Sequence, residues 1–215
     1  MLKSDLHIHT KYSMDCGTPL DRIVERCLEL GINCIAIADH GTAEGALKMQ
    51  AIAPFHVIVA EEILTPKGEI MGMFLKETIP SGLSVEETIR QIKAQGGLVC
   101  IPHPFDIIRR VGLGVKVIEK VIEEIDLIEV FNSRSPFPWN SSKARDFARR
   151  YGIPGSAGSD AHTAGEIGNA YVLMPDFNGK DEFLNSLAQG KVSGHMSNPL
   201  GHFSSAWARL KHNFI

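Results

Sequence analysis

The chain has 215 residues, of which 44% are hydrophobic and 22% charged, with a formal net charge of −3. This length allows one substantial core, and the slight acidic excess argues against a dedicated nucleic-acid binder, which usually carries a basic excess. No apolar run approaches the roughly 20 residues of a membrane-spanning helix, and the start MLKSDLHIHT lacks the pattern of a signal peptide. None of the four cysteines forms a C-x-x-C pair. We therefore expect reduced thiols, no membrane association and a cytoplasmic location.

Strand-like and helix-like segments alternate along most of the chain. After a first strand that ends near His9, we expect strands at 33–40, 55–64, 68–75, 98–103, 127–132, 153–160 and 169–174. Helices are expected at 19–30, 43–50, 85–95, 115–125, 141–151 and 180–189. Thr18 is the expected N-cap of the first helix, and Ser84 opens a capping box with Glu87. The segment from about residue 190 to the end is expected to be irregular.

Polar side chains gather where the predicted strands end. Alternating strands and helices indicate parallel β/α units, and β/α barrels carry their active sites at the carboxyl ends of the strands. A barrel brings such dispersed clusters together, whereas an open doubly wound sheet spreads them along a row. We therefore predict a barrel at residues 1–190, with a C-terminal tail at 191–215 packed on or near it.

Histidines and carboxylates dominate these clusters. His7 and His9 stand two apart, so on a strand both side chains point to the same face. Asp160 and His162 repeat this spacing, and three further candidates, His40, Glu62 and His103, each end a separate strand. Imidazole and carboxylate without thiolate suit zinc, manganese or iron. The alternative is that these are polar loop residues satisfied by local hydrogen bonds. His56, His195, His202 and His212 are expected to be structural or surface residues.

The motifs DLHIHTKYSMD, IAIADH, VAEEI, IPHP and GSDAH occur in this order between residues 3 and 173. Together they resemble the motifs of the PHP (polymerase and histidinol phosphatase) domain family. The resemblance implies an α/β fold, a distorted (β/α)7 TIM-like barrel with two or three metal ions at the C-terminal ends of the strands. Many members of that family hydrolyse phosphoesters.

The resemblance also implies a ligand set. One metal would be held by His7, His9, Glu62 and Asp160, a second by Glu62 and His103, and a third by Asp15, His40 and His162. Glu62 is chosen over Glu61 because the family's G-x-E pattern aligns with residues 60–62. Strand alternation allows only one of these two glutamates to face the site.

Several residues extend or depart from the family pattern. Family members often place a histidine where Glu69 stands here, so Glu69 is predicted as a ligand of the second metal; the alternative is a solvent-facing turn residue. Asp39 and Asp5 are expected to orient ligands, with Asp5 accepting a histidine N–H. Asn132 is predicted to hydrogen-bond a ligand or the substrate, and ordinary turn chemistry is the alternative.

The predicted reaction is hydrolysis of a phosphomonoester or small phosphodiester. Two ions about 3.5–4 Å apart would clamp the phosphoryl group and supply hydroxide at neutral pH. His162 is a candidate proton donor. Arg134 and Arg109 are candidates for phosphate contact, or are only surface charges. The expected partner is a small phosphorylated substrate or a short oligonucleotide, and the oligomeric state is not predictable from the sequence.

Two other functions remain open. An amidohydrolase-type barrel also begins with H-x-H, but it usually uses a bridging lysine and further histidines on later strands. This chain offers Glu62 as the bridge and has Asn132 where another histidine would be expected. A metal-binding accessory module without catalysis is the second alternative; such modules often lose ligands, and this set looks complete.

Overall fold

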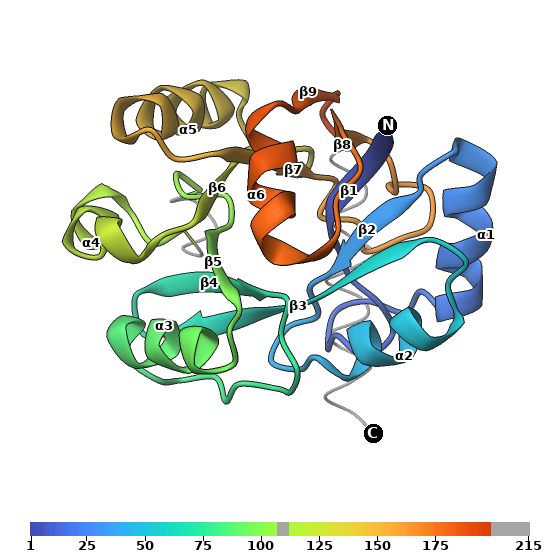
Figure 1. Cartoon of the computed structure of the whole chain (residues 1–215), viewed down its shortest axis with the longest axis horizontal. Helices are drawn as coiled ribbons and strands as arrows, with labels where there is room; N and C mark the ends of the chain where they lie inside the picture. Colours follow the sequence, from blue (N-terminus) through green and yellow to red (C-terminus); the bar gives the residue numbers. More distant parts are fainter. Residues whose placement is uncertain (107–111, 199–215) are drawn as a thin grey trace.

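The computed structural model describes residues 1–106 and 112–198 (Figure 1). The strands are β1 (Leu2–Ile8), β2 (Cys34–Ile37), β3 (His56–Thr65), β4 (Gly68–Met73), β5 (Leu98–Ile101), β6 (Leu127–Asn132), β7 (Gly155–Gly158), β8 (Ala170–Met174) and β9 (Lys191–Gly194). The helices are α1 (Leu20–Leu30), α2 (Glu44–Ile52), α3 (Val85–Ala94), α4 (Val115–Lys120), α5 (Pro138–Tyr151) and α6 (Gly179–Ala188), with a 3-10 turn at Ile122–Glu124. Within the described ranges, no helix is both long and apolar enough to cross a membrane.

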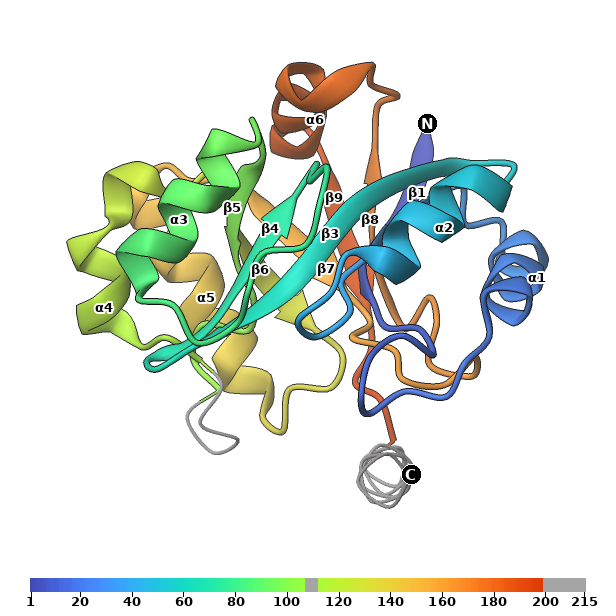
Figure 2. The same cartoon turned by 90° about the horizontal axis from the view of Figure 1, so that it is seen from below.

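The described strands form one sheet in the order β7-β6-β5-β4-β3-β2-β1-β8-β9, curled into a nearly closed barrel (Figures 1 and 2). A parallel bridge between Ile8 and Ala161 joins the end of β1 to the segment after β7. The predicted α/β barrel is therefore confirmed. Its strand pattern differs from seven repeated β/α units, because β4, β8 and β9 pair antiparallel with their neighbours.

Side chains separate into an inner and an outer hydrophobic cluster. On β3, Ile58 and Ala60 belong to the inner cluster, whereas Val59 and Ile63 pack in the outer cluster beneath the helices. Phe177, Phe183 and Leu187 add the apolar face of α6 to the inner cluster. Figure 2 shows α6 at one end of the barrel, near the N-terminus. The inner core is thus closed at the amino ends of the strands, and the carboxyl ends remain for polar side chains.

A bulge in β1 changes which side chains face the inside. Leu6 belongs to the inner cluster and Ile8 to the outer cluster, although both would share one face of a regular strand. The register of β1 against β2 shifts between Asp5 and Ile8, which accounts for the change. His7 therefore points inward like Leu6, and Asp5 does not share the face of His7 and His9.

Two local expectations need correction. Helix α1 begins at Leu20 with Pro19 at the N-cap, while the hydroxyl of Thr18 donates to the carbonyl of His162 at 3.1 Å. Thr18 therefore holds a distant loop instead of capping the helix. The segment after residue 190 is not wholly irregular, because β9 pairs with β8. The Ser84 cap is confirmed, since its Oγ accepts the N–H of Glu87 at 3.2 Å.

Candidate metal centre

The predicted ligands come together at one end of the barrel, which is the carboxyl end of the parallel strands and the beginning of the antiparallel β4. His7 lies on β1 with His9 just beyond it, Asp15 lies in the following loop, His40 follows β2, Glu62 and Glu69 lie on β3 and β4, His103 follows β5, and Asp160 and His162 follow β7. They form four overlapping groups whose candidate ligand atoms lie within 4.8 Å of one another. Residues far apart in the sequence therefore surround one shared volume.

Glu62 lies at the middle of these groups. Its Oε1 is 2.8 Å from Nε2 of His103. Its Oε2 is 3.4 Å from Nε2 of His7, 3.5 Å from Nε2 of His9 and 3.3 Å from Nδ1 of His40. The neighbouring Glu61 turns to the other side of β3, where it accepts the N–H of Ile79. Strand alternation thus brings only Glu62 into the site.

The group formed by His7, His9 and Asp160 is close to the dimensions of a metal site. Nε2 of His9 is 3.2 Å from Nε2 of His7 and 3.2 Å from Oδ1 of Asp160, while the third distance, from Nε2 of His7 to Oδ1 of Asp160, is longer at 3.9 Å. Metal–ligand bonds of about 2.1 Å place neighbouring ligand atoms about 2.9–3.4 Å apart in octahedral or tetrahedral geometry. Nδ1 of His7 is hydrogen-bonded to Glu129, so its Nε2 can present a lone pair to the site. The residues present therefore fit a divalent metal ion.

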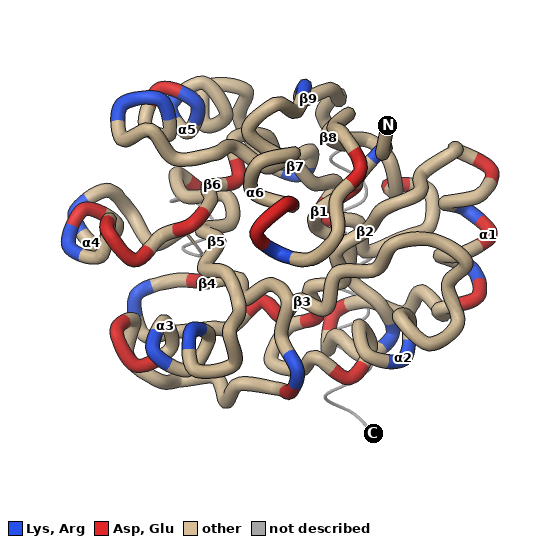
Figure 3. The backbone as a smooth tube through the Cα atoms, viewed as in Figure 1, with Lys and Arg blue, Asp and Glu red and all other residues tan. Residues whose placement is uncertain are grey.

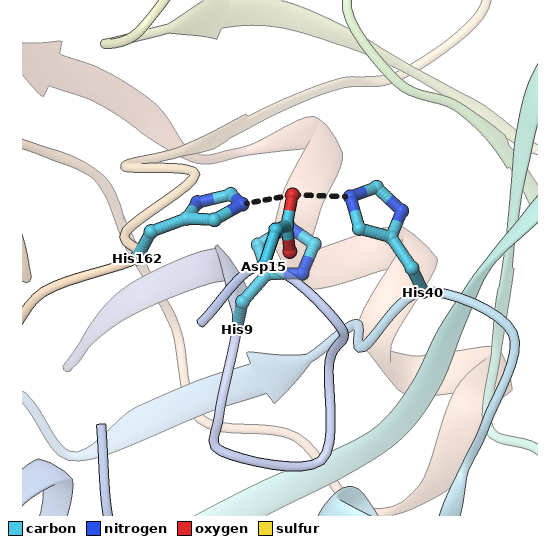
Figure 4. A group of neighbouring side chains, drawn as sticks. All are labelled: His9, Asp15, His40 and His162. Carbon is cyan, nitrogen blue, oxygen red and sulfur yellow. Dashed lines mark ion pairs between the residues drawn. The ribbon is translucent and has the colours of Figure 1, made fainter. Parts of the chain in front are cut away.

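Asp15 joins two histidines in a second part of the site, shown in Figure 4. Its Oδ2 is 3.1 Å from Nε2 of His162 and 3.4 Å from Nε2 of His40. Ser13 donates to the other carboxylate oxygen at 2.8 Å. His9 completes this group as well as the first one. The loop after β1 thus brings Asp15 to His40 and His162, the two partners that the family resemblance implies.

Glu69 lies on the remaining side of the site. Its carboxylate is 3.7 Å from Nδ1 of His40 and 3.6 Å from Nε2 of His103. Only 6% of its surface is exposed, so the alternative of a solvent-facing turn residue is wrong. Burial and the nearby charge of Glu62 raise the pKa of Glu69 to about 7. A bound cation would remove this penalty by pairing with the carboxylate.

The electrostatics of the other ligands follow from their neighbours. Burial opposes the charge of Asp15, but hydrogen bonds from His162 and His40 hold its pKa well below its usual range. Burial likewise opposes the charge of Glu62, and the surrounding histidines, led by His7, lower its pKa. Burial and the nearby His162 lower the pKa of His9 to about 3. His9 is therefore neutral at pH 7, which is the form that binds metals.

Glu129 is a buried residue of this region that the sequence analysis missed. It lies on β6 and is only 3% exposed. Its Oε1 is 3.0 Å from Nδ1 of His7, and its Oε2 accepts the backbone N–H of His103 at 2.8 Å. Asn132 donates to Glu129 at 2.9 Å and to Oδ2 of Asp160 at 3.3 Å, so it contacts a predicted ligand. The sequence did contain a signal for Glu129, because a glutamate inside the apolar run LIEVFN needs polar partners.

Asp5 and Asp39 both accept backbone N–H groups close to the predicted ligands. Asp5 is fully buried, but it accepts the backbone N–H groups of Ser159 and Gly168 at 2.8 and 2.9 Å. A histidine ring N–H is not among these bonds: the β1 bulge takes Asp5 off the face of His7 and His9, and backbone groups, that of His7 included, stabilise its carboxylate instead. Asp39 accepts both the backbone N–H and the hydroxyl of Thr10, at 2.6 and 2.7 Å. It therefore holds the backbone next to His9 and does not bond the side chain of a ligand in these contacts.

Arg134 is 3% exposed, so the alternative of a surface charge is wrong. Its Nη1 lies 3.5 Å from the carbonyl of Asp160, and its Nε lies 3.6 Å from Oε1 of Glu166. Arg109, His202 and His212 lie outside the described residues. His56 lies apart from the site and pairs with Asp176 at 3.4 Å. His195 is exposed, as expected of a residue in the tail.

The backbone is strained where two of these side chains enter the site. His103 has a φ of 27° and Asp160 a φ of 54°, a region that non-glycine residues rarely adopt. Beside Asp160, Gly158 allows β7 to approach β1: a Cβ built there would lie 2.2 Å from Cβ of His7. Both features bring Asp160 close to His7 and His9.

Comparison with known proteins identifies the family. Residues 5–137 match the model of the PHP domain, and residues 138–192 match the model described as PHP-associated. The chain therefore belongs to the PHP domain family. An uncharacterized protein of Methanocaldococcus jannaschii is 35% identical over 196 residues, which are 86% of this chain and 79% of that protein.

Solved structures show the same fold. A two-domain protein of Bacteroides vulgatus, which contains a predicted PHP-like metal-dependent phosphoesterase, has a TM-score of 0.71 at 17% identity over 90% of this chain and 65% of that one. An amidohydrolase of Chromobacterium violaceum with bound sulfate and no metal has a TM-score of 0.62 at 17% identity over 77% and 89%. The family and the observed ligand set together support a metal-dependent hydrolase.

Proposed function

We propose that the protein is a metal-dependent phosphoesterase that hydrolyses a phosphomonoester or a small phosphodiester. The observation that supports this most is the position of Glu62. One of its oxygens faces His103, while the other faces His7, His9 and His40. A carboxylate with ligand-type atoms on both sides is suited to bridge two ions. Two or three divalent ions, zinc, manganese or iron, would supply charge stabilisation for a phosphoryl group and lower the pKa of a water molecule.

The chain's own residues have distinct tasks in this proposal. The carboxylates and imidazoles of the site, most of them buried, would hold the cations at this end of the barrel. Arg134 adds a positive charge beside Asp160, where a phosphate oxygen would benefit from it. His162 has Nδ1 at 2.9 Å from the carbonyl of Asp160 and Nε2 facing Asp15. These contacts favour a ligand role for His162 over the role of proton donor.

The charge distribution favours a small substrate. Figure 3 shows Lys and Arg residues on outer helices such as α5, whereas acidic residues also occupy strands β3 and β6. A long nucleic acid is usually bound by clustered basic residues along its path. We therefore propose a small phosphorylated molecule or a short oligonucleotide as the substrate.

The test is a panel of phosphoesters assayed with zinc, manganese or iron after chelator treatment. Glu62→Gln should abolish turnover, because a neutral amide cannot bridge two cations. Glu61→Gln is the matched control: it changes the neighbouring buried glutamate on the opposite face of β3, and it should keep the activity. No metal-dependent turnover of any phosphoester would contradict the proposal. Metal binding without turnover would indicate an accessory module.

An amidohydrolase is the second candidate, because a protein with that description shares the fold. For the bridging position this chain offers the carboxylate of Glu62 and not a lysine, which favours the phosphoesterase. Amides and cyclic amides in the same panel separate the two functions. Turnover of amides alone, again lost in Glu62→Gln, would favour the second candidate.

A further inference from the structure

Three hydrogen-bond donors surround the carboxylate of Glu129. Nδ1 of His7 lies 3.0 Å from Oε1. The backbone N–H of His103 and the side-chain amide of Asn132 both donate to Oε2, at 2.8 and 2.9 Å. All four residues are buried. Glu129 therefore contacts a predicted ligand on β1 and the backbone of another one after β5.

Two of these donors have no alternative role. The N–H of His103 is a backbone group and can only donate. The amide of Asn132 is fixed in orientation, because its Oδ1 accepts the backbone N–H of Arg134 at 2.9 Å. Its Nδ2 must therefore face Glu129 and Asp160 and donate to both. Oε2 of Glu129 has to be an acceptor.

The third contact decides which nitrogen of His7 keeps its proton when a metal ion binds. With Oε2 occupied, Oε1 is the remaining acceptor, and a carboxylate oxygen requires a proton on Nδ1 of His7. A neutral imidazole with its proton on Nδ1 has its lone pair on Nε2. Nε2 is the atom that faces His9 and Glu62, at 3.2 and 3.4 Å. The proton on Nδ1 thus leaves the ligand atom of His7 available to a metal ion.

We propose that Glu129 positions two of the predicted metal ligands, by fixing His7 with Nε2 free for metal and by holding the backbone of His103. This rests on the metal centre of the proposed function, but not on its substrate. The contact with His103 is important because that residue has a φ of 27°, and an N–H acceptor stabilises such a strained conformation. Through Asn132, the same carboxylate also orients Asp160.

Glu129→Gln tests this proposal, since it keeps the size and shape of the side chain. Glutamine has one acceptor oxygen, which the two fixed donors require. Its NH2 group would then donate to Nδ1 of His7. Nδ1 can accept only without a proton, so the proton of the neutral imidazole would sit on Nε2 and block the atom that would bind the metal. The expected result is zinc binding about 10–100-fold weaker in competition with a chromophoric chelator, the usual effect of losing a partner of a metal-binding histidine.

Glu61→Gln is again the matched control, because it makes the same change in a buried glutamate that contacts none of the ligands in the described bonds. It should bind zinc like the wild type. Wild-type zinc affinity in Glu129→Gln would overturn the proposal. The phosphoester assay is independent: wild-type protein that binds zinc but cleaves no phosphoester would refute the proposed function and leave the role of Glu129 standing.

A measurement on the wild type avoids dependence on the folding of the variant. Nitrogen-15 spectra of the zinc-loaded protein should show His7 with zinc on Nε2 and a slowly exchanging proton on Nδ1. Zinc on Nδ1 of His7, or a rapidly exchanging Nδ1 proton, would overturn the proposal. A residue needed only for packing would not fix the proton to one nitrogen of His7.

Discussion

Glu61 gives the fold a pH-dependent stability that can be measured. Its side chain is fully buried beside the outer cluster, away from the metal centre. One oxygen accepts the N–H of Ile79 at 2.8 Å, and the other has no hydrogen-bond partner among the described residues. Burial raises the pKa of Glu61 from 4.5 to about 7. The folded protein therefore keeps a proton that the unfolded chain releases.

The direction of the effect follows from this difference in pKa. Below pH 4.5 both states are protonated, and Glu61 does not reduce the free energy of unfolding. As the pH rises, the unfolded chain ionises first and is favoured, and the loss of stability is complete once the pH exceeds the folded pKa of about 7. The loss is about 1 kcal/mol at pH 5 and about 3 kcal/mol at pH 8, at 1.4 kcal/mol per pKa unit.

Glu61→Gln removes the ionisable group and keeps an acceptor for the N–H of Ile79. The free energy of unfolding of the variant minus that of the wild type should become larger by about 2–3 kcal/mol as the pH rises from 5 to 8. Urea unfolding of both proteins at matched metal loading measures this, since contributions of the other groups cancel in the difference. A difference between the two proteins that stays constant with pH would refute the reasoning.

Three further results are expected of the metal centre. The purified protein, loaded with metal, should carry at least two ions per chain by elemental analysis, because ligand groups lie on both sides of Glu62; less than one ion would contradict the metal site. His103→Ala should abolish hydrolysis while circular dichroism shows an intact fold, and near-normal turnover with retained metal would refute its role. Asp15→Ala should lose one ion and keep the others, whereas His9→Ala should lose more, because His9 belongs to two ligand groups; equal metal contents of the two variants would contradict this order.

The success of the sequence analysis depended on regular strands and specific motifs. On β3, strand alternation separates Glu62 from Glu61, and the structure has the same arrangement. Barrel topology places the ends of distant strands together, so residues such as His103 and Asp160 could be grouped without knowledge of any distance. Where the backbone follows the regular period, the sequence is sufficient to predict which side chains meet.

The errors occur where the backbone departs from that period. Regular alternation would place Asp5 on the face of His7 and His9, but the β1 bulge removes it from that face, and nothing in the residue types of this strand indicates an extra residue. The strained φ angles of His103 and Asp160 are equally invisible in the sequence. Glu129 was detectable, because a charge inside an apolar strand needs partners, but its three donors come from segments whose approach only the fold determines.

The buried carboxylates next to the ligands have a common task that explains why the chain tolerates them. Each accepts a backbone N–H at a ligand or beside one: Asp39 bonds Thr10, Glu129 bonds His103, Asp5 bonds Ser159 and Glu166 bonds His162. A buried charge without partners is costly, but backbone N–H groups stabilise it and are themselves fixed in place. Irregular loops thereby acquire defined positions at the end of the barrel. These four carboxylates thereby fix the backbone at or beside the side chains that would contact the metal.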